Sequence, residues 1–409
     1  MKRLECLDGL RGVLAFYVLV SHVASFAVIP AWIAGPLSHS GAAVDVFFIL
    51  SGLVIVQSLE SFNWRARGFL VARVARIYPV YLVMFAVAVA LQAVPADFTR
   101  LAWIDPNSQA HGIWSGGWPR AWPAEIAAHL TMTHGLLPDA VLPAVWITFL
   151  GSAWSLSTEW QFYVLALLAG ARVGPRRMVA VFMVLAIAGL LWQGLAADDW
   201  RFSRAFLPNK AQYFALGIAG AVLARGGAGA AWTYGVTLAA TLLLCGLQGG
   251  AEKLLPPLAW TVCLVAQLRP EVAGLRVVVR MLRAPVLQRL GALSYCIYLA
   301  NEPILKAFGV PLATLVDGDA WWFTALWVPG AIGLPLLAAS WLHAWVERPA
   351  QRWGRAYARR VSVRDAAIPD LVHAFAGATN GAQPPAQGTA PCPASTALPP
   401  FPPTALAPR

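Results

Sequence analysis

The sequence predicts an all-α membrane protein, built as a bundle of about ten transmembrane helices. Three observations support this prediction. Of the 409 residues, 59% are hydrophobic and only 12% are charged, whereas a soluble domain has about 25% charged residues. The apolar residues gather in runs long enough to cross a bilayer, which takes about 20 residues. Basic residues cluster between alternate runs, as they do in cytoplasmic loops.

The first three helices are predicted from the first three apolar runs. Residues 8–29 follow Lys2 and Arg3, and we interpret them as an uncleaved helix because the run is too long and too charged for a signal peptide. Residues 42–59 return to the cytoplasm. A basic stretch at 65–76 is expected inside, and residues 77–94 lead out again.

Residues 95–151 are predicted to lie outside the cell. They hold several Trp, Gly and Pro residues and two short apolar segments, 124–137 and 140–150, which suit interfacial or re-entrant pieces better than full spans. Seven further spans are predicted at 152–171, 178–196, 206–224, 232–247, 254–268, 290–308 and 321–346, the last one interrupted by Pro329 and Pro335. Ten spans put both termini in the cytoplasm, with the excess of Lys and Arg on that side.

The chain divides into one membrane domain, residues 1–352, and a cytoplasmic tail, residues 353–409. The tail is first basic and then rich in Pro and Ala, a composition that cannot bury a core, so it is expected to be disordered. The net charge of +11 does not indicate nucleic-acid binding, because the arginines lie between apolar runs. We expect membrane lipid to surround the membrane domain.

Two polar residues in the first helix are costly at membrane depth and call for partners or a purpose. Arg11 and His22 lie eleven positions apart, about three turns plus 20°, so both face the same side of the helix. They are about 16 Å apart along its axis. The helix therefore presents a cation near the inner face and a titratable imidazole deeper in the membrane.

Other ionisable residues are expected at similar depths. Asp45 and Glu159 fall in the outer half of their helices, near the predicted level of His22, whereas Arg73 and Arg76 lie at the inner face beside Arg11. A histidine is suited to act as a general base near neutral pH, and either carboxylate would orient its other ring nitrogen. The arginines would bind phosphates of a cytoplasmic donor.

Each of these residues also has a purely structural interpretation. A lone membrane histidine can simply be hydrogen bonded within the bundle, and the basic cluster can be only a topology signal. The outer tryptophans are more often interfacial residues than sugar platforms. His129 and His134 lie five positions apart and lack the spacing of a helical metal pair, so we predict no metal site there.

Six motifs in order resemble the acyltransferase-3 family of bacterial membrane O-acyltransferases. They are LDGLRGVLAFYVLVSHV, GAAVDVFFILSGLVI, FLVARVARIYPVY, SAWSLSTEWQFY, LGALSYCIYLANEP and VERPAQRW. The resemblance implies a multi-pass protein of the bacterial inner membrane that moves an acetyl or other short acyl group from acyl-CoA, with acetyl-CoA as the expected donor, to a hydroxyl of a cell-surface or secreted glycan.

The resemblance also implies roles for particular residues. His22 and Arg11 are expected to be catalytic, with Asp45 and Glu159 as candidate partners, and Arg73 and Arg76 to contact the donor. Candidate substrate-binding residues are Trp154, Ser155, Tyr163 and Asn301. Many family members have His at the position of Asn301, which cannot take up a proton near pH 7, so acid–base chemistry is expected to rest on His22.

Two alternatives stay open at this point. The same chemistry on a small lipophilic acceptor, such as a macrolide, would use the same residues. A transporter or lipid exporter without acyl transfer would also suit many helices with intramembrane charges, although the sequence lacks the internal repeat common in transporters.

Overall fold

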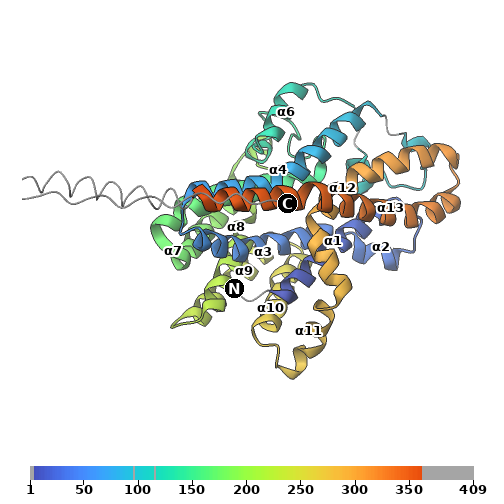
Figure 1. Ribbon diagram of the computed structural model, residues 1–409. Helices are drawn as coiled ribbons and strands as arrows, with labels where there is room; N and C mark the ends of the chain where they lie inside the picture. The colour runs from blue at the N-terminus through green and yellow to red at the C-terminus, as the bar shows by residue number, and fades with distance from the viewer. Residues whose placement is uncertain (1–3, 95–96, 115–116, 362–409) are drawn as a thin grey trace, which may run out of the picture. The chain divides into compact units, whose positions relative to one another are not determined.

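The described part of the chain is entirely helical. The computed structural model describes residues 4–94, 97–114 and 117–361, and within these ranges it contains no strand (Figure 1). Its α-helices are α1 Glu5–Ala24, α2 Ala31–Leu37, α3 Ser40–Ser61, α4 Ala66–Ala90, α5 Gln109–Ile113, α6 Trp122–Leu130, α7 Trp154–Leu195, α8 Ala211–Arg225, α9 Ala230–Leu247, α10 Leu255–Leu268, α11 Arg276–Leu282, α12 Pro285–Leu315 and α13 Ala320–Leu342.

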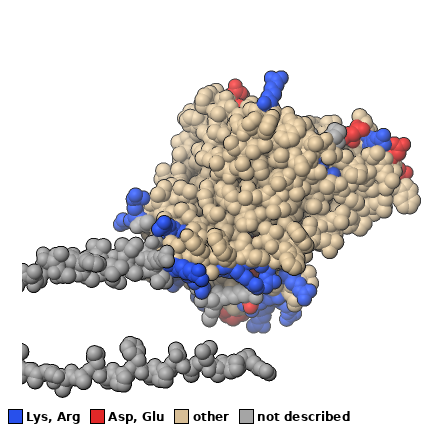
Figure 2. Space-filling view, turned by 45° about the horizontal axis from the view of Figure 1, so that its top comes forward, with Lys and Arg blue, Asp and Glu red and all other residues tan. Residues whose placement is uncertain are grey.

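Six helical segments of this part are long and apolar enough to cross a membrane. They are Glu5–Ala24, Ala31–Ser61, Ala66–Ala93, Arg172–Leu195, Ala230–Leu247 and Ala320–Val361. Figure 2 shows Lys and Arg side chains gathered along one edge of the described unit, next to a broad face with few charged side chains. The predicted all-α membrane class is therefore confirmed, whereas six of the ten predicted spans meet this criterion.

Several element boundaries differ from the predictions. Helix α4 begins at Ala66 rather than at residue 77, so Arg73 and Arg76 lie on a helix face instead of in a loop. The reason is local, because the residues of this stretch are mostly good helix formers. Residues 140–150, predicted as an interfacial or re-entrant piece, form turns, and α2 lies between the first two predicted spans, where no helix was predicted.

Proline and glycine positions explain other differences. Gly174 has φ 73° and ψ 168° and separates two helical halves of α7, close to the predicted boundary between the fourth and fifth spans. Pro329 and Pro335 do not interrupt α13. A π-helical turn, His343–Glu347, follows α13, and the helix then continues to Val361, past the predicted domain boundary at 352. The rest of the predicted tail lies outside the described residues.

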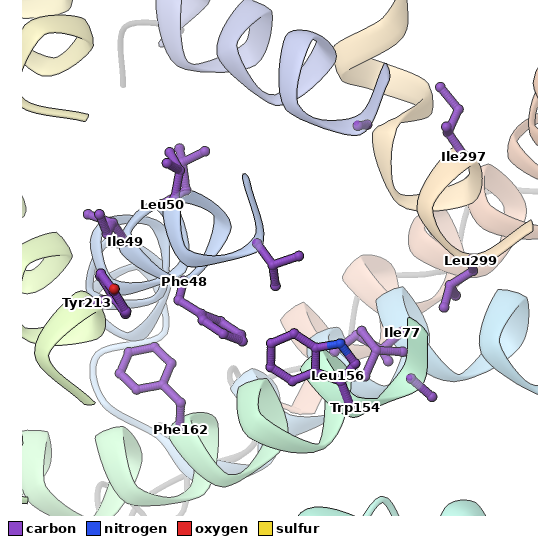
Figure 3. Packing of buried hydrophobic residues seen from close by; sticks show 14 of the residues in the cluster. Phe48, Ile49, Leu50, Ile77, Trp154, Leu156, Phe162, Tyr213, Ile297 and Leu299 are labelled. Carbon is purple, nitrogen blue, oxygen red and sulfur yellow. The ribbon is translucent and has the colours of Figure 1, made fainter. Parts of the chain in front are cut away.

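A buried aromatic cluster joins α3, α7 and α8. The Phe48 ring lies 5.7 Å from the Trp154 ring and 5.0 Å from Phe214, and Phe162 stacks on Phe214 at 4.2 Å between centroids. Figure 3 shows Phe48 of α3 between Trp154 and Phe162 of α7. Pairs of this kind add about 0.5–1.5 kcal/mol beyond burial alone, and they fix the start of α7 against α3.

Helices α1 and α12 approach each other at backbone distance. A Cβ atom added at Gly291 of α12 would lie 2.0 Å from the carbonyl oxygen of Asp8 on α1. One added at Gly12 of α1 would lie 2.4 Å from the carbonyl oxygen of Leu287. Only residues without a side chain allow such an approach. The contact sets how closely the later turns of the two helices face each other.

We expect Gly291→Ala to force α12 away from α1. Overpacking of this kind costs about 1–3 kcal/mol, so the thermal unfolding midpoint of the purified protein in detergent should fall. Gly235→Ala on α9 is the matched control, because an added Cβ there meets no atom within 4 Å. An equal midpoint for the two variants would contradict the contact.

Candidate functional site

The centre of the candidate site is a hydrogen bond between α1 and α12. His22 Nδ1 lies 2.7 Å from Asn301 Oδ1. The His22 side chain is 9% exposed and Asn301 is fully buried. Two sequence-predicted residues, 279 positions apart in the chain, therefore meet inside the bundle.

The hydrogen bonds of Asn301 define the tautomer of His22. Asn301 Nδ2 donates to the carbonyl oxygens of Tyr298, at 2.8 Å, and Ile297, at 3.3 Å. The amide oxygen therefore faces His22, and it can only accept, so Nδ1 carries the proton. In the described part of the chain no group hydrogen bonds His22 Nε2, whose lone pair is then available to a hydroxyl.

The carboxylates expected to orient His22 lie elsewhere. Asp45 is buried and accepts a hydrogen bond from Lys210 Nζ at 2.6 Å. Glu159 accepts from Ser51 Oγ. Among the described residues neither carboxylate hydrogen bonds His22, so the predicted orienting bond comes instead from Asn301. Depth along a helix does not define the direction in which a side chain points, and a carboxylate in the bundle needs its own partner.

A cavity of about 480 Å³ lies beside this centre. Arg11, Arg73 and Arg76 line it together with Glu159, and it also reaches Ser155 and Tyr298. Its size is that of a typical small-molecule pocket. Ser155 Oγ and the Tyr298 hydroxyl are 3.0 Å apart, and Asn301 follows Tyr298 by one helical turn. Neither His22 nor Asn301 is among the residues that line the cavity, and Tyr298 of α12 is the lining residue nearest to Asn301 along the chain.

Glu159 belongs to the arginine-lined cavity and not to the surroundings of His22. It interacts electrostatically with Arg11, with Arg73 and with Tyr163, and Tyr163 also lines the cavity. A carboxylate between guanidinium groups lowers their mutual repulsion. The geometry therefore indicates a balancing charge at this position.

The arginines of α4 are held by aromatic and hydroxyl groups. Arg73 Nη2 donates to Ser58 Oγ at 2.5 Å, and its guanidinium carbon lies 5.5 Å from the Phe69 ring centre and 5.7 Å from that of Tyr163. Such cation–π contacts orient a guanidinium without neutralising its charge. Arg73 therefore remains able to bind an anion.

Several residues near the site were not singled out in the sequence. Glu302 interacts electrostatically with His22 and accepts a hydrogen bond from the backbone N–H of Ser152 at 2.8 Å. Lys210 and Arg204 lie over the Trp154 ring, so Trp154 packs between cations and Phe48 and does not line the cavity. Glu302 directly follows Asn301 and could have been suspected from its place in an apolar helix.

The comparisons with known proteins identify the family of the chain. The acyltransferase domain family matches residues 4–345. The chain belongs to the acyltransferase 3 family. It is 27% identical over 386 residues to acyltransferase MdmB of Streptomyces mycarofaciens, covering 86% of this chain and 92% of that protein. It is 31% identical over 199 residues to protein 2 in the picA locus of Rhizobium radiobacter, covering 46% of this chain and 92% of that protein. No solved structure matches the chain.

The acyltransferase 3 assignment confirms the predicted family and makes the chain a membrane acyltransferase. An enzyme of this kind needs an acyl donor and an acyl acceptor. The roles of individual residues remain predictions. The structure adds Glu302 and Lys210 to the candidate site residues.

This acyltransferase also contains a buried histidine pair between α4 and α7, outside the candidate spans. The rings of His129 and His134 stack with centroids 4.1 Å apart. Their Nε2 atoms lie 3.0 Å from the carbonyl oxygen of Val145 and 3.2 Å from that of Ala153. Burial lowers the pKa of His134 to about 4 and that of His129 well below its ordinary value.

We expect this pair to make the acyltransferase sensitive to acid. The unfolded chain takes up protons near pH 6.5, whereas the folded His134 stays neutral down to about pH 4. Stability therefore falls as the pH drops from about 6.5 toward 4, by on the order of 1 kcal/mol per pH unit for His134, and His129 acts in the same direction. Thermal unfolding between pH 7.5 and 5 measures the slope. His134→Phe should reduce it, and an unchanged slope would contradict this account.

Proposed function

We propose that the protein transfers an acetyl or other short acyl group from acyl-CoA to a hydroxyl of a cell-surface or secreted glycan, with His22 as the general base. The observation that carries this proposal is the cavity, which is lined by arginines and by Tyr298, one helical turn before Asn301, the hydrogen-bond partner of His22. Guanidinium groups suit the phosphates of the donor.

The donor would enter from the cytoplasm and bind with its phosphates near Arg73, Arg76 and Arg11, all of which line the cavity. Arg11 and His22 are about 16 Å apart along α1, a distance that an extended thioester arm can bridge. Ser155 and Tyr163 line the same cavity and are proposed to contact substrate. The proposed reaction uses no metal.

We propose that the acyl group passes directly from the thioester to the acceptor hydroxyl. His22 Nε2 removes the proton of the acceptor hydroxyl, and the oxygen forms a bond to the carbonyl carbon of the thioester. The carbon–sulfur bond breaks, and the CoA thiolate takes a proton from the imidazolium. Asn301 Oδ1 stabilises that imidazolium through Nδ1–H, the role that a carboxylate has in a catalytic triad.

The proposed location is the bacterial inner membrane, with ten spans, both termini cytoplasmic and a cytoplasmic tail after residue 352. Four further helical pieces do not count as candidate spans by length and apolarity. They support the number of ten spans because each of them packs against one of the six candidate spans. Helices α10 and α12 contact α1, and α8 and the first half of α7 contact α3. Membrane lipid then surrounds the bundle.

We expect His22→Ala to lower acyl transfer at least about 10²- to 10⁴-fold, the range of a lost general base. The assay uses purified protein with labelled acetyl-CoA, and membrane abundance should stay unchanged. His39→Ala is the control, because His39 is exposed and lies before the start of α3. Near-normal transfer by His22→Ala would remove the proposed base.

We expect Asn301→Leu to lower the turnover rate about ten- to hundredfold, because the imidazolium loses a charge-assisted hydrogen bond. Asn301→Asp keeps an oxygen opposite Nδ1 and should retain more activity. The measurement is kcat at saturating donor for both variants. Equal losses would show that Asn301 acts only through packing.

The acceptor is identified by mass spectrometry of surface glycans from a deletion strain, in which an acetyl mass should disappear. Unchanged glycans together with acetylation of an added macrolide would favour the small-molecule acceptor. Transport into proteoliposomes without an acyl donor would favour an exporter, although the family assignment supports an enzyme.

A further inference from the structure

A second set of polar residues faces the cavity from the end of the last helix. Gln351, Arg355 and Arg359 line the same cavity as Arg73 and Arg76. They are spaced by four residues, so they lie on one side of the helix. Arg352 and Arg360 are exposed on the same helix and are not among the residues that line the cavity.

One contact holds this side of the helix against α4, and hydrogen bonds of Glu347 hold it near α12. A Cβ atom added at Gly354 would lie 2.2 Å from the Cβ of Ala75, so the helix passes α4 closely between Arg73 and Arg76. Glu347 accepts hydrogen bonds from Gln351 Nε2, at 2.7 Å, and from Cys296 Sγ, at 3.2 Å. These contacts fix the rotation of the last helix about its own axis, in the part of the helix that lines the cavity.

The placement of charge indicates an anionic ligand. Five arginines line one cavity, and Glu159 is the carboxylate among its lining residues. Like charges around one space repel each other, so the arrangement is stabilised when a polyanion binds there. Arg355 and Arg359 are exposed, whereas Arg11 and Arg73 are half-buried, so the two arginines of the last helix are the more accessible to a ligand from solvent.

We infer that Arg355 and Arg359 bind the nucleotide phosphates of the acyl donor, and that the end of the last helix is part of the donor site. This inference rests on the proposed function, because it assumes that coenzyme A occupies the cavity. Guanidinium groups bind phosphates through paired hydrogen bonds, and two of them one turn apart on one helix face suit neighbouring phosphate groups.

The test is coenzyme A binding by the full-length protein in detergent, measured by titration calorimetry. Arg355→Gln with Arg359→Gln should weaken binding about ten- to hundredfold and raise the KM for acetyl-CoA, with kcat unchanged at saturation. Arg352→Gln with Arg360→Gln is the matched control, because it removes the same charge from the same helix outside the cavity. It should bind like the wild type.

The possible outcomes distinguish a failure of this inference from a failure of the proposed function. Equal affinity of both double variants and the wild type would overturn the inference while leaving the proposed function intact. An equal loss in both double variants would also overturn it, since general charge would then explain the effect. Absence of coenzyme A binding by the wild type would remove the proposed donor and the inference with it. Size-exclusion elution of each variant checks that it is folded.

Discussion

The close backbone contact between α1 and α12 is the constraint on which the candidate site depends. Gly12 and Gly291 allow the two helices to touch without side chains between them, and the same two helices then carry His22 and Asn301 to a separation of 2.7 Å. A hydrogen bond of this length tolerates little displacement. The first helix can therefore supply the base only because the ninth apolar run of the chain lies against it.

Much of the fold was predictable because apolar length and basic loops follow directly from the bilayer. The helices at Glu5–Ala24 and Ser40–Ser61 fall within a few residues of the predicted runs. The early start of α4 was not predicted, because arginines were interpreted as loop residues although they also favour helices. The spans α8 and α10 are short and depend on packing, which a hydropathy pattern does not describe.

The sequence predicted several residues of the candidate site, but it did not predict which of their side chains contact each other. His22 and Asn301 were both predicted, yet the orienting role was assigned to Asp45 or Glu159. Asp45 instead pairs with Lys210, which is the last residue of a short 3₁₀ turn and gave no sequence signal. Helix rise fixes depth, whereas partner choice depends on helix rotation and on contacts between distant segments. Those arise only in the folded chain.

The distribution of charge connects the fold with the chemistry. Asn301 gives the imidazole a neutral hydrogen-bond acceptor, which defines its tautomer. Fixed positive charge is instead concentrated along the cavity at Arg11, Arg73 and Arg76. One helix, α1, thus contributes to both regions, because Arg11 lines the cavity and His22 lies about three turns further along the same helix. A donor that is anionic at one end and neutral at its thioester matches this division.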